Sequence, residues 1–371
     1  MIYADNAATS LLDRDAYEAM IPYLLDLYGN ASQPYSFSRD TKKALREARK
    51  MIAECINAEP GEIFFTSGGT ESNNWAIKGL LQGELKSAGV ITSAIEHHSV
   101  LNPCATLEKL GHSVKYAKVD SKGMVNVKAL EESIEKSDKL VSIMMANNEI
   151  GTVQEIKELS SIAHKHNKIF HTDAVQALGH IKVDVKELDV DLLSASAHKF
   201  NGPKGIGFLY IRDGISIAPL IEGGNQEFGF RSGTENVASI VGMAIALKNN
   251  VGCIDEHQKY IWELEKSFLS ELNSLGLDYV RNGSGRGVPG NLSLSFRNAD
   301  GEMLLHRLDL LGILVSTGSA CNGSMSEVSH VLKAIGVAKE YAEGTIRVSL
   351  NHLNTKDEVI AIANAIKKIL G

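Results

Sequence analysis

Apolar residues recur along the first part of the chain in short runs separated by longer amphipathic stretches. The runs lie at 63–65, 90–92, 114–117, 140–145, 169–172, 191–195 and 206–211. Helical periodicity fills most of the gaps, at 72–85, 99–110, 127–136 and 154–165. Buried strands that alternate with helices predict a mainly parallel sheet sandwiched by helices. The sequence therefore predicts an α/β fold with a seven-stranded sheet, in which 206–211 is antiparallel because only a short turn precedes it.

The pattern changes after about residue 235. Long amphipathic helices are expected at 235–251 and 255–275, followed by short strands at 292–296, 314–316 and 346–350. Helical patterns at 302–311, 329–335 and 356–370 separate these strands. This predicts a smaller α+β domain. We place the large domain at 14–255 and build the small domain from 1–13 and 256–371.

Composition excludes several classes of protein. The 371 residues carry a net charge of −7, so there is no overall basic surface for nucleic acid. The N-terminus lacks a signal pattern, and no apolar run approaches the roughly 18 residues of a membrane span. The four cysteines lie far apart without metal-ligand spacing. We therefore expect a cytoplasmic protein with no metal, no membrane and no direct nucleic-acid partner.

Lys199 is the first candidate for chemistry. It lies just after the buried run that ends at Ala195, in the segment 194–205, which reads SASAHKFNGPKG. Burial disfavours an ammonium ion, and a neutral amine can form a Schiff base with an aldehyde. Spacing alone favours an ordinary lysine of a surface turn. Other motifs in the chain are therefore needed to distinguish a Schiff-base lysine from a surface lysine.

The segment SxHK followed by GPKGxG resembles the lysine segment of pyridoxal 5′-phosphate (PLP) enzymes, specifically the NifS/IscS-like cysteine desulfurases of the class V aminotransferase family. The resemblance covers nearly the whole chain and includes DNAAT at 5–9, TSGGTESN at 66–73 and NNEIG at 147–151. It implies PLP fold type I, PLP as cofactor and a homodimer. The sequence after Asn30 departs from the family pattern.

A glycine turn leads from a strand into a helix at Gly69 and Thr70. Free N–H groups at a helix start can bind phosphate, although a plain helix cap is the simpler interpretation of the motif taken alone. The resemblance implies that Gly69 and Thr70 bind the PLP phosphate together with Ser196 and His198. It also implies that Thr234 reaches the phosphate from the partner subunit.

Further residues would contact the PLP ring and the substrate. The resemblance implies that His97 stacks on the ring and moves protons, that Asp173 keeps the ring nitrogen protonated and that Gln176 binds the ring oxygen. It places Asn148 beside the cofactor and the substrate carboxylate, which Arg347 would bind with its planar fork. Without the resemblance, the ordinary alternatives are a structural histidine for His97, a turn-capping aspartate for Asp173 and a surface ion pair for Arg347.

Cys321 separates this family from general aminotransferases. It lies in STGSACNGS at 316–324, where small polar residues argue against a core position. A thiolate can take sulfur from a substrate and hold it as a persulfide. The alternative is a small buried side chain, which is how we interpret Cys55, Cys104 and Cys253.

The sequence therefore predicts a cysteine desulfurase that converts L-cysteine to L-alanine. Lys199, Cys321 and His97 would be catalytic, and an acceptor protein would take the sulfur for iron–sulfur cluster assembly or tRNA thiolation. A selenocysteine lyase, or another PLP enzyme of the aminotransferase fold, is the alternative. A non-catalytic scaffold with the same fold would be colourless. The acceptor and the preference between cysteine and selenocysteine stay open.

Overall fold

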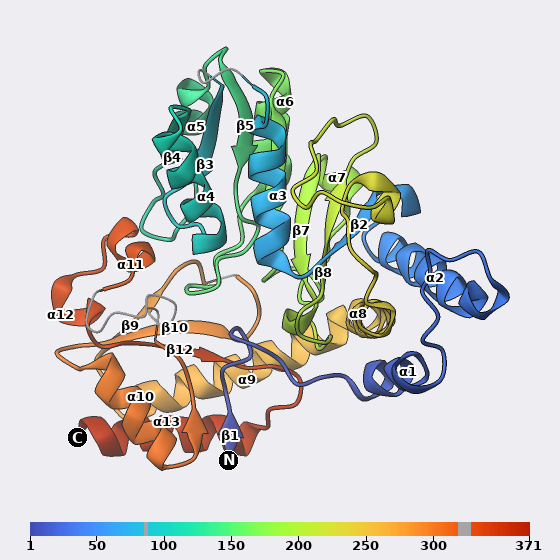
Figure 1. The fold of residues 1–371 in the computed structure, drawn as a ribbon. Helices are drawn as coiled ribbons and strands as arrows, with labels where there is room; N and C mark the ends of the chain where they lie inside the picture. Colours follow the sequence, from blue (N-terminus) through green and yellow to red (C-terminus); the bar gives the residue numbers. More distant parts are fainter. Residues whose placement is uncertain (85–87, 286, 318–327) are drawn as a thin grey trace.

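A seven-stranded sheet is the central element of the computed structural model, which describes residues 1–84, 88–285, 287–317 and 328–371 (Figure 1). In sheet order its strands are β2 (Ile63–Thr66), β8 (Gly207–Ile211), β7 (Leu192–Ser196), β6 (Ile169–Asp173), β5 (Asp138–Ser142), β3 (Gly89–Ser93) and β4 (Ser113–Ala117). Only the pairs that β8 makes with β2 and β7 are antiparallel. The predicted fold class and the antiparallel strand are both confirmed.

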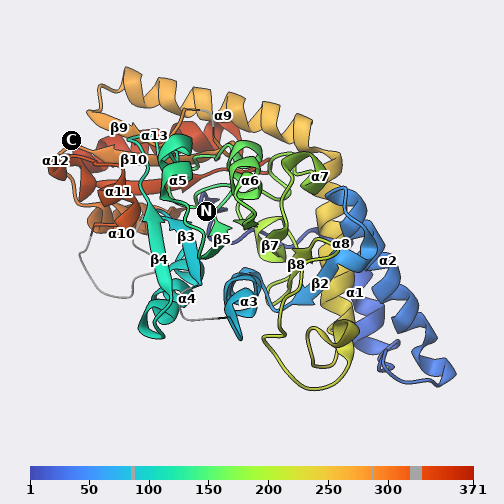
Figure 2. The same ribbon diagram turned by 90° about the horizontal axis from the view of Figure 1, so that it is seen from above.

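Helices cover both faces of this sheet. They are α1 (Arg14–Leu25), α2 (Arg39–Cys55), α3 (Gly69–Leu81), α4 (His98–Lys109), α5 (Val127–Ser133), α6 (Ile156–Lys165), α7 (Val185–Leu188) and α8 (Val237–Gly252). Figure 2 shows α3 and α4 on one side, and α5, α6 and α7 on the other. Successive strand residues face opposite sides, so Phe64 belongs to the hydrophobic core that includes α3 and α4, while Phe65 belongs to the core that includes α2 and α6.

A second part of the chain has its own core. Its antiparallel sheet has the order β12 (Thr345–Ser349), β10 (Asn291–Phe296) and β9 (Tyr279–Asn282), and β1 (Ile2–Tyr3) pairs with β11 (Ile313–Leu314). Its helices are α9 (Ile254–Ser274), α10 (Gly301–Leu310), α11 (His330–Ala334), α12 (Lys339–Ala342) and α13 (Lys356–Leu370). The apolar faces of α9, α10 and α13 pack together with β10 and β12. This separate core supports our proposal that the small domain is 1–13 plus 256–371.

The junction of α8 and α9 corrects one expectation. Cys253, interpreted from sequence as a packing residue, is exposed between the two helices. The helix axes bend by 69° at this junction, and Cys253 belongs to neither of the two large hydrophobic cores. Within the described ranges no single helix is long and apolar enough to cross a membrane, and only this bent pair reaches that length and composition together.

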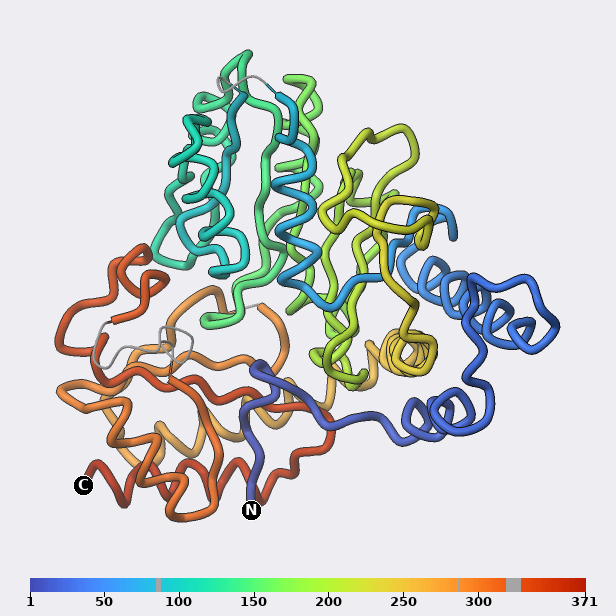
Figure 3. The backbone as a smooth tube through the Cα atoms, in the orientation of Figure 1, coloured from blue at the N-terminus to red at the C-terminus, as the bar shows by residue number. Residues whose placement is uncertain are grey.

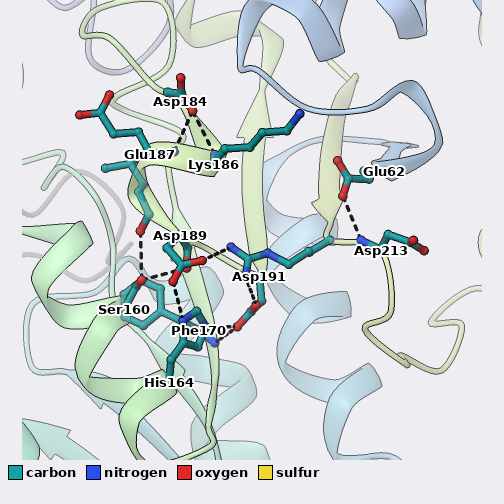
Figure 4. Close-up of polar contacts among 12 residues, drawn as sticks. Glu62, Ser160, His164, Phe170, Asp184, Lys186, Glu187, Asp189, Asp191 and Asp213 are labelled. Carbon is teal, nitrogen blue, oxygen red and sulfur yellow. Dashed lines mark hydrogen bonds and ion pairs between the residues drawn. The ribbon is translucent and has the colours of Figure 1, made fainter.

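A cluster of polar side chains lies at the amino end of β7 (Figure 4). Nδ1 of His164 lies 2.9 Å from Oδ2 of Asp189, and its Nε2 lies 2.8 Å from Oδ2 of Asp191. Arg212 also bonds Asp189, at 2.7 Å, and the backbone N–H of Phe170 donates to Asp191. Both ring nitrogens face carboxylates, an arrangement that favours the imidazolium form of His164, in which both nitrogens donate. Burial opposes that charge, but the bonds to Asp191 and Asp189 raise the pKa of His164.

We predict that His164→Gln destabilises the fold more in acid than in alkali. A histidine whose folded-state pKa is raised contributes its full stability below its unfolded pKa, which is about 6.5. That contribution is lost as the pH rises through the folded pKa. The variant should therefore lose about 1 kcal/mol in urea unfolding at pH 6 and clearly less at pH 9. The exposed His306→Gln is the matched control, and an equal loss at both pH values would contradict the prediction.

Candidate active site

The carboxyl ends of the parallel strands face a cavity of about 390 Å³ between the two parts of the chain. The sequence-predicted residues that line it are Gly69, Thr70, His97, Asn148, Asp173, Gln176, Ser196, His198, Lys199 and Arg347. Thr234 is exposed and does not line this cavity. Cys321 lies outside the described residues. The cavity is therefore built from segments more than 250 positions apart, and its volume is that of a small-molecule site.

The start of α3 forms a close-fitting cradle. Gly68 caps the helix with φ 145°, a conformation that favours glycine. A Cβ on Gly69 would come within 2.5 Å of Cγ2 of Val175, and a Cβ on Gly207 would overlap the backbone of Ala195. Glycine at these positions therefore brings the N–H groups of the helix start to the cavity wall, where they can bind a phosphate.

An ion pair fixes this cradle from outside. Nε and Nη2 of Arg231 donate to Glu71 at 2.8 and 3.1 Å, and the backbone N–H of Ser67 donates to the same carboxylate at 2.7 Å. Burial alone would raise the pKa of Glu71, but the bonds from Arg231 and Ser67 lower it below its usual value. Glu71 stays ionised and ties the glycine turn to the segment that carries Thr234.

The amine of Lys199 lies at the end of the short 3-10 helix η3 (Ala197–Lys199). Its Nζ donates to the carbonyls of Ala7 and Ala8 at 2.6 and 2.8 Å. Figure 3 shows how the N-terminal segment crosses from the small part of the chain to reach the seven-stranded part. Gln176 donates to the same Ala7 carbonyl, at 2.9 Å. Residues 5–9 therefore form one wall of the cavity.

Asp173 ends β6 and is only 4% exposed. Its Oδ2 accepts from Nδ2 of Asn73 at 2.7 Å, and its Oδ1 accepts from the backbone N–H of Val175 at 2.9 Å. These are neutral donors, so the described residues supply no cation in direct contact with this buried carboxylate. A buried carboxylate is stabilised by a positive partner, which a protonated ring nitrogen would provide.

Arg347 lies on the opposite wall, at β12. Its Nη2 lies 2.7 Å from Oδ1 of Asp5, and its Nη1 donates to the carbonyl of Asn148 at 2.9 Å. Its buried Nε has no hydrogen-bond partner within the part of the chain that the structure describes. Glu149 is beside it, and burial raises the pKa of that carboxyl to about 7 despite Ser329 and Arg347. The guanidinium lines the cavity, and a planar guanidinium is suited to bind a carboxylate there.

Histidines gather on the third side of the cavity. His97 caps α4, and its Nδ1 accepts from the N–H of Ser99 at 3.1 Å. Burial lowers the pKa of His97, Asp173 opposes the shift, and Lys199 and His98 add to it. Burial and the neighbouring Lys199 and Lys204 lower the pKa of His198 to about 4. Both rings are therefore neutral near pH 7.

Comparison with known proteins agrees with this geometry. The model of the aminotransferase class-V family matches residues 2–362. A cysteine desulfurase IscS of Dictyoglomus turgidum is 49% identical over 100% of this chain and 94% of its own length. A solved NifS-like protein is 40% identical with a TM-score of 0.94, covering 100% of this chain and 99% of that one. The solved structure "SspA in complex with cysteine" is 34% identical with a TM-score of 0.84, covering 94% and 99%.

The chain belongs to the class V aminotransferase family. Within it, the chain groups with the NifS/IscS-like cysteine desulfurases, and these enzymes depend on PLP. The residues present fit that cofactor. The α3 cradle suits its phosphate, and the buried Asp173 lacks a cation that the ring nitrogen would supply. Lys199 supplies the amine.

Four further residues of the cavity wall have no role predicted from the sequence. Asn73 and Ser99 line the cavity and bond each other at 2.8 Å, and His330 and Glu149 line it as well. One signal for Asn73 was available, because residues four apart on a helix share a face and Gly69 precedes it by four. The contact of Asn73 with Ser99 joins two helices, and no local pattern predicts it.

We predict that Gly69→Ala weakens PLP retention. The new methyl group would press on Val175, which lines the cavity. We expect about tenfold weaker PLP binding, close to 1.4 kcal/mol, in a titration of the cofactor-free protein. Gly61→Ala is the matched control, because a Cβ there meets nothing within 4 Å. Unchanged PLP affinity in Gly69→Ala would contradict this account of the cradle.

Proposed function

We propose that this protein is a cysteine desulfurase that converts L-cysteine to L-alanine and passes the sulfur to a thiol of its own. The observation that carries the proposal is that one cavity holds an amine, a buried carboxylate and a carboxylate-binding guanidinium, from Lys199, Asp173 and Arg347. Relatives named cysteine desulfurase at up to 49% identity support it, as does the neighbour whose title names bound cysteine.

Each residue has a role that its surroundings support. Arg347 lines the cavity and binds the substrate carboxylate through its guanidinium, and Asn148 lies beside it. When bound, PLP withdraws electrons from the α-carbon of an amino acid attached to it. Lys199 holds the cofactor and then moves the α-proton. His97, neutral and buried, assists that proton transfer.

Cys321 takes the sulfur in this proposal. Its thiolate attacks the sulfur of the substrate, so that a sulfur–sulfur bond forms as the carbon–sulfur bond breaks. The carbon gains a proton and leaves as alanine, and the enzyme keeps one extra sulfur as a persulfide. A thiol of an acceptor protein can then remove that sulfur by exchange.

We predict that Lys199→Ala and Cys321→Ser fail in different ways. Lys199→Ala should lose the visible absorption of a lysine-bound cofactor, together with all turnover. Cys321→Ser should keep that absorption and lose alanine formation from cysteine by at least about 100-fold. Cys253→Ser is the matched control, since this exposed cysteine lies at the α8–α9 junction and does not line the site cavity.

Two results would contradict the proposal. A colourless wild-type protein that takes up no PLP would favour the scaffold interpretation. Full cysteine desulfuration by Cys321→Ser would remove the thiol from the mechanism. Release of selenide from selenocysteine by Cys321→Ser, with no desulfuration of cysteine, would instead favour the selenocysteine lyase alternative.

We also propose that the active unit is a homodimer. Exposed apolar side chains concentrate on α1 and in the segment that follows it, at Leu24, Leu25 and Tyr28. An apolar patch of this kind is typical of a protein interface. The exposed Thr234 does not line the cavity of its own chain, which supports its assignment to the cavity of a second copy.

The dimer proposal predicts a change in mass. Sedimentation should give twice the 40.1 kDa of one chain for the wild type. The double variant Leu24→Glu with Leu25→Glu should shift toward one chain and retain PLP more weakly, because charge is costly in an apolar interface. The exposed Leu310→Glu is the control. A monomeric wild type with full activity would contradict the proposal.

The acceptor protein, the pathway that it serves and a cytoplasmic location stay predictions. Persulfide transfer needs a partner with an accessible thiol, and that chemistry suits iron–sulfur cluster assembly and tRNA thiolation equally. Recovery of proteins that carry sulfur after incubation with the enzyme and labelled cysteine would identify the acceptor.

A further inference from the structure

A chain of hydrogen bonds links two cavity residues that lie on different elements. Nδ2 of Asn73 on α3 lies 2.7 Å from Oδ2 of Asp173 and 2.8 Å from Oγ of Ser99. Oγ of Ser99 lies 2.8 Å from Nδ1 of His97, and the N–H of Ser99 donates to the same nitrogen at 3.1 Å. Asn73, Ser99 and Asp173 are all buried. The chain therefore runs from the end of β6 to the cap of α4 through buried side chains.

The chemistry of these groups fixes the direction of each bond. An ionised Asp173 only accepts, so Asn73 must present its NH2 group to it. The reversed amide would place Oδ1 of Asn73 against the carboxylate. The second hydrogen of that NH2 group points to Oγ of Ser99, which therefore accepts from Asn73. The hydroxyl hydrogen of Ser99 is then left for Nδ1 of His97.

His97 consequently receives two donors on one ring nitrogen, the hydroxyl and the backbone N–H of Ser99. A proton on Nδ1 would face both of them. The neutral ring must therefore carry its single proton on Nε2, and protonation of Nδ1 would break both bonds.

We propose that Asn73 and Ser99 are positioning residues that hold His97 in the tautomer protonated on Nε2 and couple it to the ionised Asp173. The inference deepens the proposed function, because His97 and Asp173 are the groups expected to face the cofactor ring and its nitrogen. Neither Asn73 nor Ser99 needs to touch the reacting atoms. Each acts through the group that it orients.

Other groups also face His97 and set its titration. They are Asp173 on β6, Lys199 at η3, His98 on α4 and His330 on α11. Burial and the positive neighbours already lower the pKa of His97, while Asp173 opposes them. The two Ser99 donors act in the same direction as burial, since both bind only the unprotonated Nδ1.

The test follows the histidine ring itself, in the holoenzyme labelled with ¹⁵N-histidine. His97 is assigned by its absence in His97→Gln. In the wild type, Nδ1 should report an unprotonated acceptor and Nε2 a protonated nitrogen at pH 7.5. Ser99→Ala should raise the apparent pKa of His97 by about half to one unit, because one donor to the neutral ring is gone. Asn73→Ala should shift it in the same direction, because Ser99 is then free to turn its hydroxyl away.

Two further variants distinguish a specific effect of the Ser99 hydroxyl on His97 from a general loss of structure. Ser99→Thr keeps the hydroxyl and should restore the wild-type titration. Thr106→Ala removes an exposed hydroxyl from the same helix α4 and should leave the titration unchanged. In turnover, Ser99→Ala should lower kcat by about tenfold with little change in KM, less than the loss of a whole acid–base group.

Two outcomes would overturn the inference. One is a wild-type His97 that carries its proton on Nδ1. The other is an unchanged titration in both Ser99→Ala and Asn73→Ala, with any loss confined to thermal stability. The ring titration does not depend on turnover. A wild type without desulfurase activity but with the expected titrations would therefore contradict the proposed function and leave the positioning network intact.

Discussion

The buried carboxylate of Asp173 is the constraint around which the site is arranged. It lies at the end of a central strand, where two neutral donors, the Asn73 amide and the Val175 N–H, hold its oxygens. An ionised carboxylate in such a place is costly without a cation, and the described residues place none in contact with it. The strand thus ends in an unbalanced charge that faces a cavity. A ring nitrogen placed beside it would relieve that cost by holding a proton, and the carboxylate would in turn raise the pKa of that nitrogen.

The order of the strands explains why the other groups meet this carboxylate. β3, β5, β6 and β7 are parallel, so the segments after their carboxyl ends emerge at one edge of the sheet. β8 returns antiparallel, and its Gly207 lets the Gly68 turn approach β7 closely. The helix start that can hold a phosphate and the turn that carries Lys199 are brought together by that approach. A side chain at Gly207 would separate them.

Much of this arrangement could be predicted from sequence because it depends on local periodicity. The seven strands of the large sheet and the antiparallel exception follow from apolar spacing and were confirmed, although β5 ends at Ser142 and not at residue 145. In the small part of the chain, β9 was not predicted. Helix starts were less accurate, since α3 begins at Gly69 and not at residue 72. The exposure of Cys253 depends on the angle between two helices, which the apolar pattern does not encode. The link from Asn73 to Ser99 likewise depends on how α3 packs against α4.

The N-terminal segment contacts site residues that come from both sheets. Asp5 bonds Arg347, and the carbonyls of Ala7 and Ala8 accept from Lys199. One short segment therefore contacts both basic side chains that the proposed chemistry uses. A substrate carboxylate has to share the Arg347 guanidinium with Asp5, and a cofactor attached to Lys199 has to displace its bonds to the two carbonyls. Ligand binding therefore has to replace contacts made by Asp5, Ala7 and Ala8, and the energy of those contacts counts against the binding of both ligands.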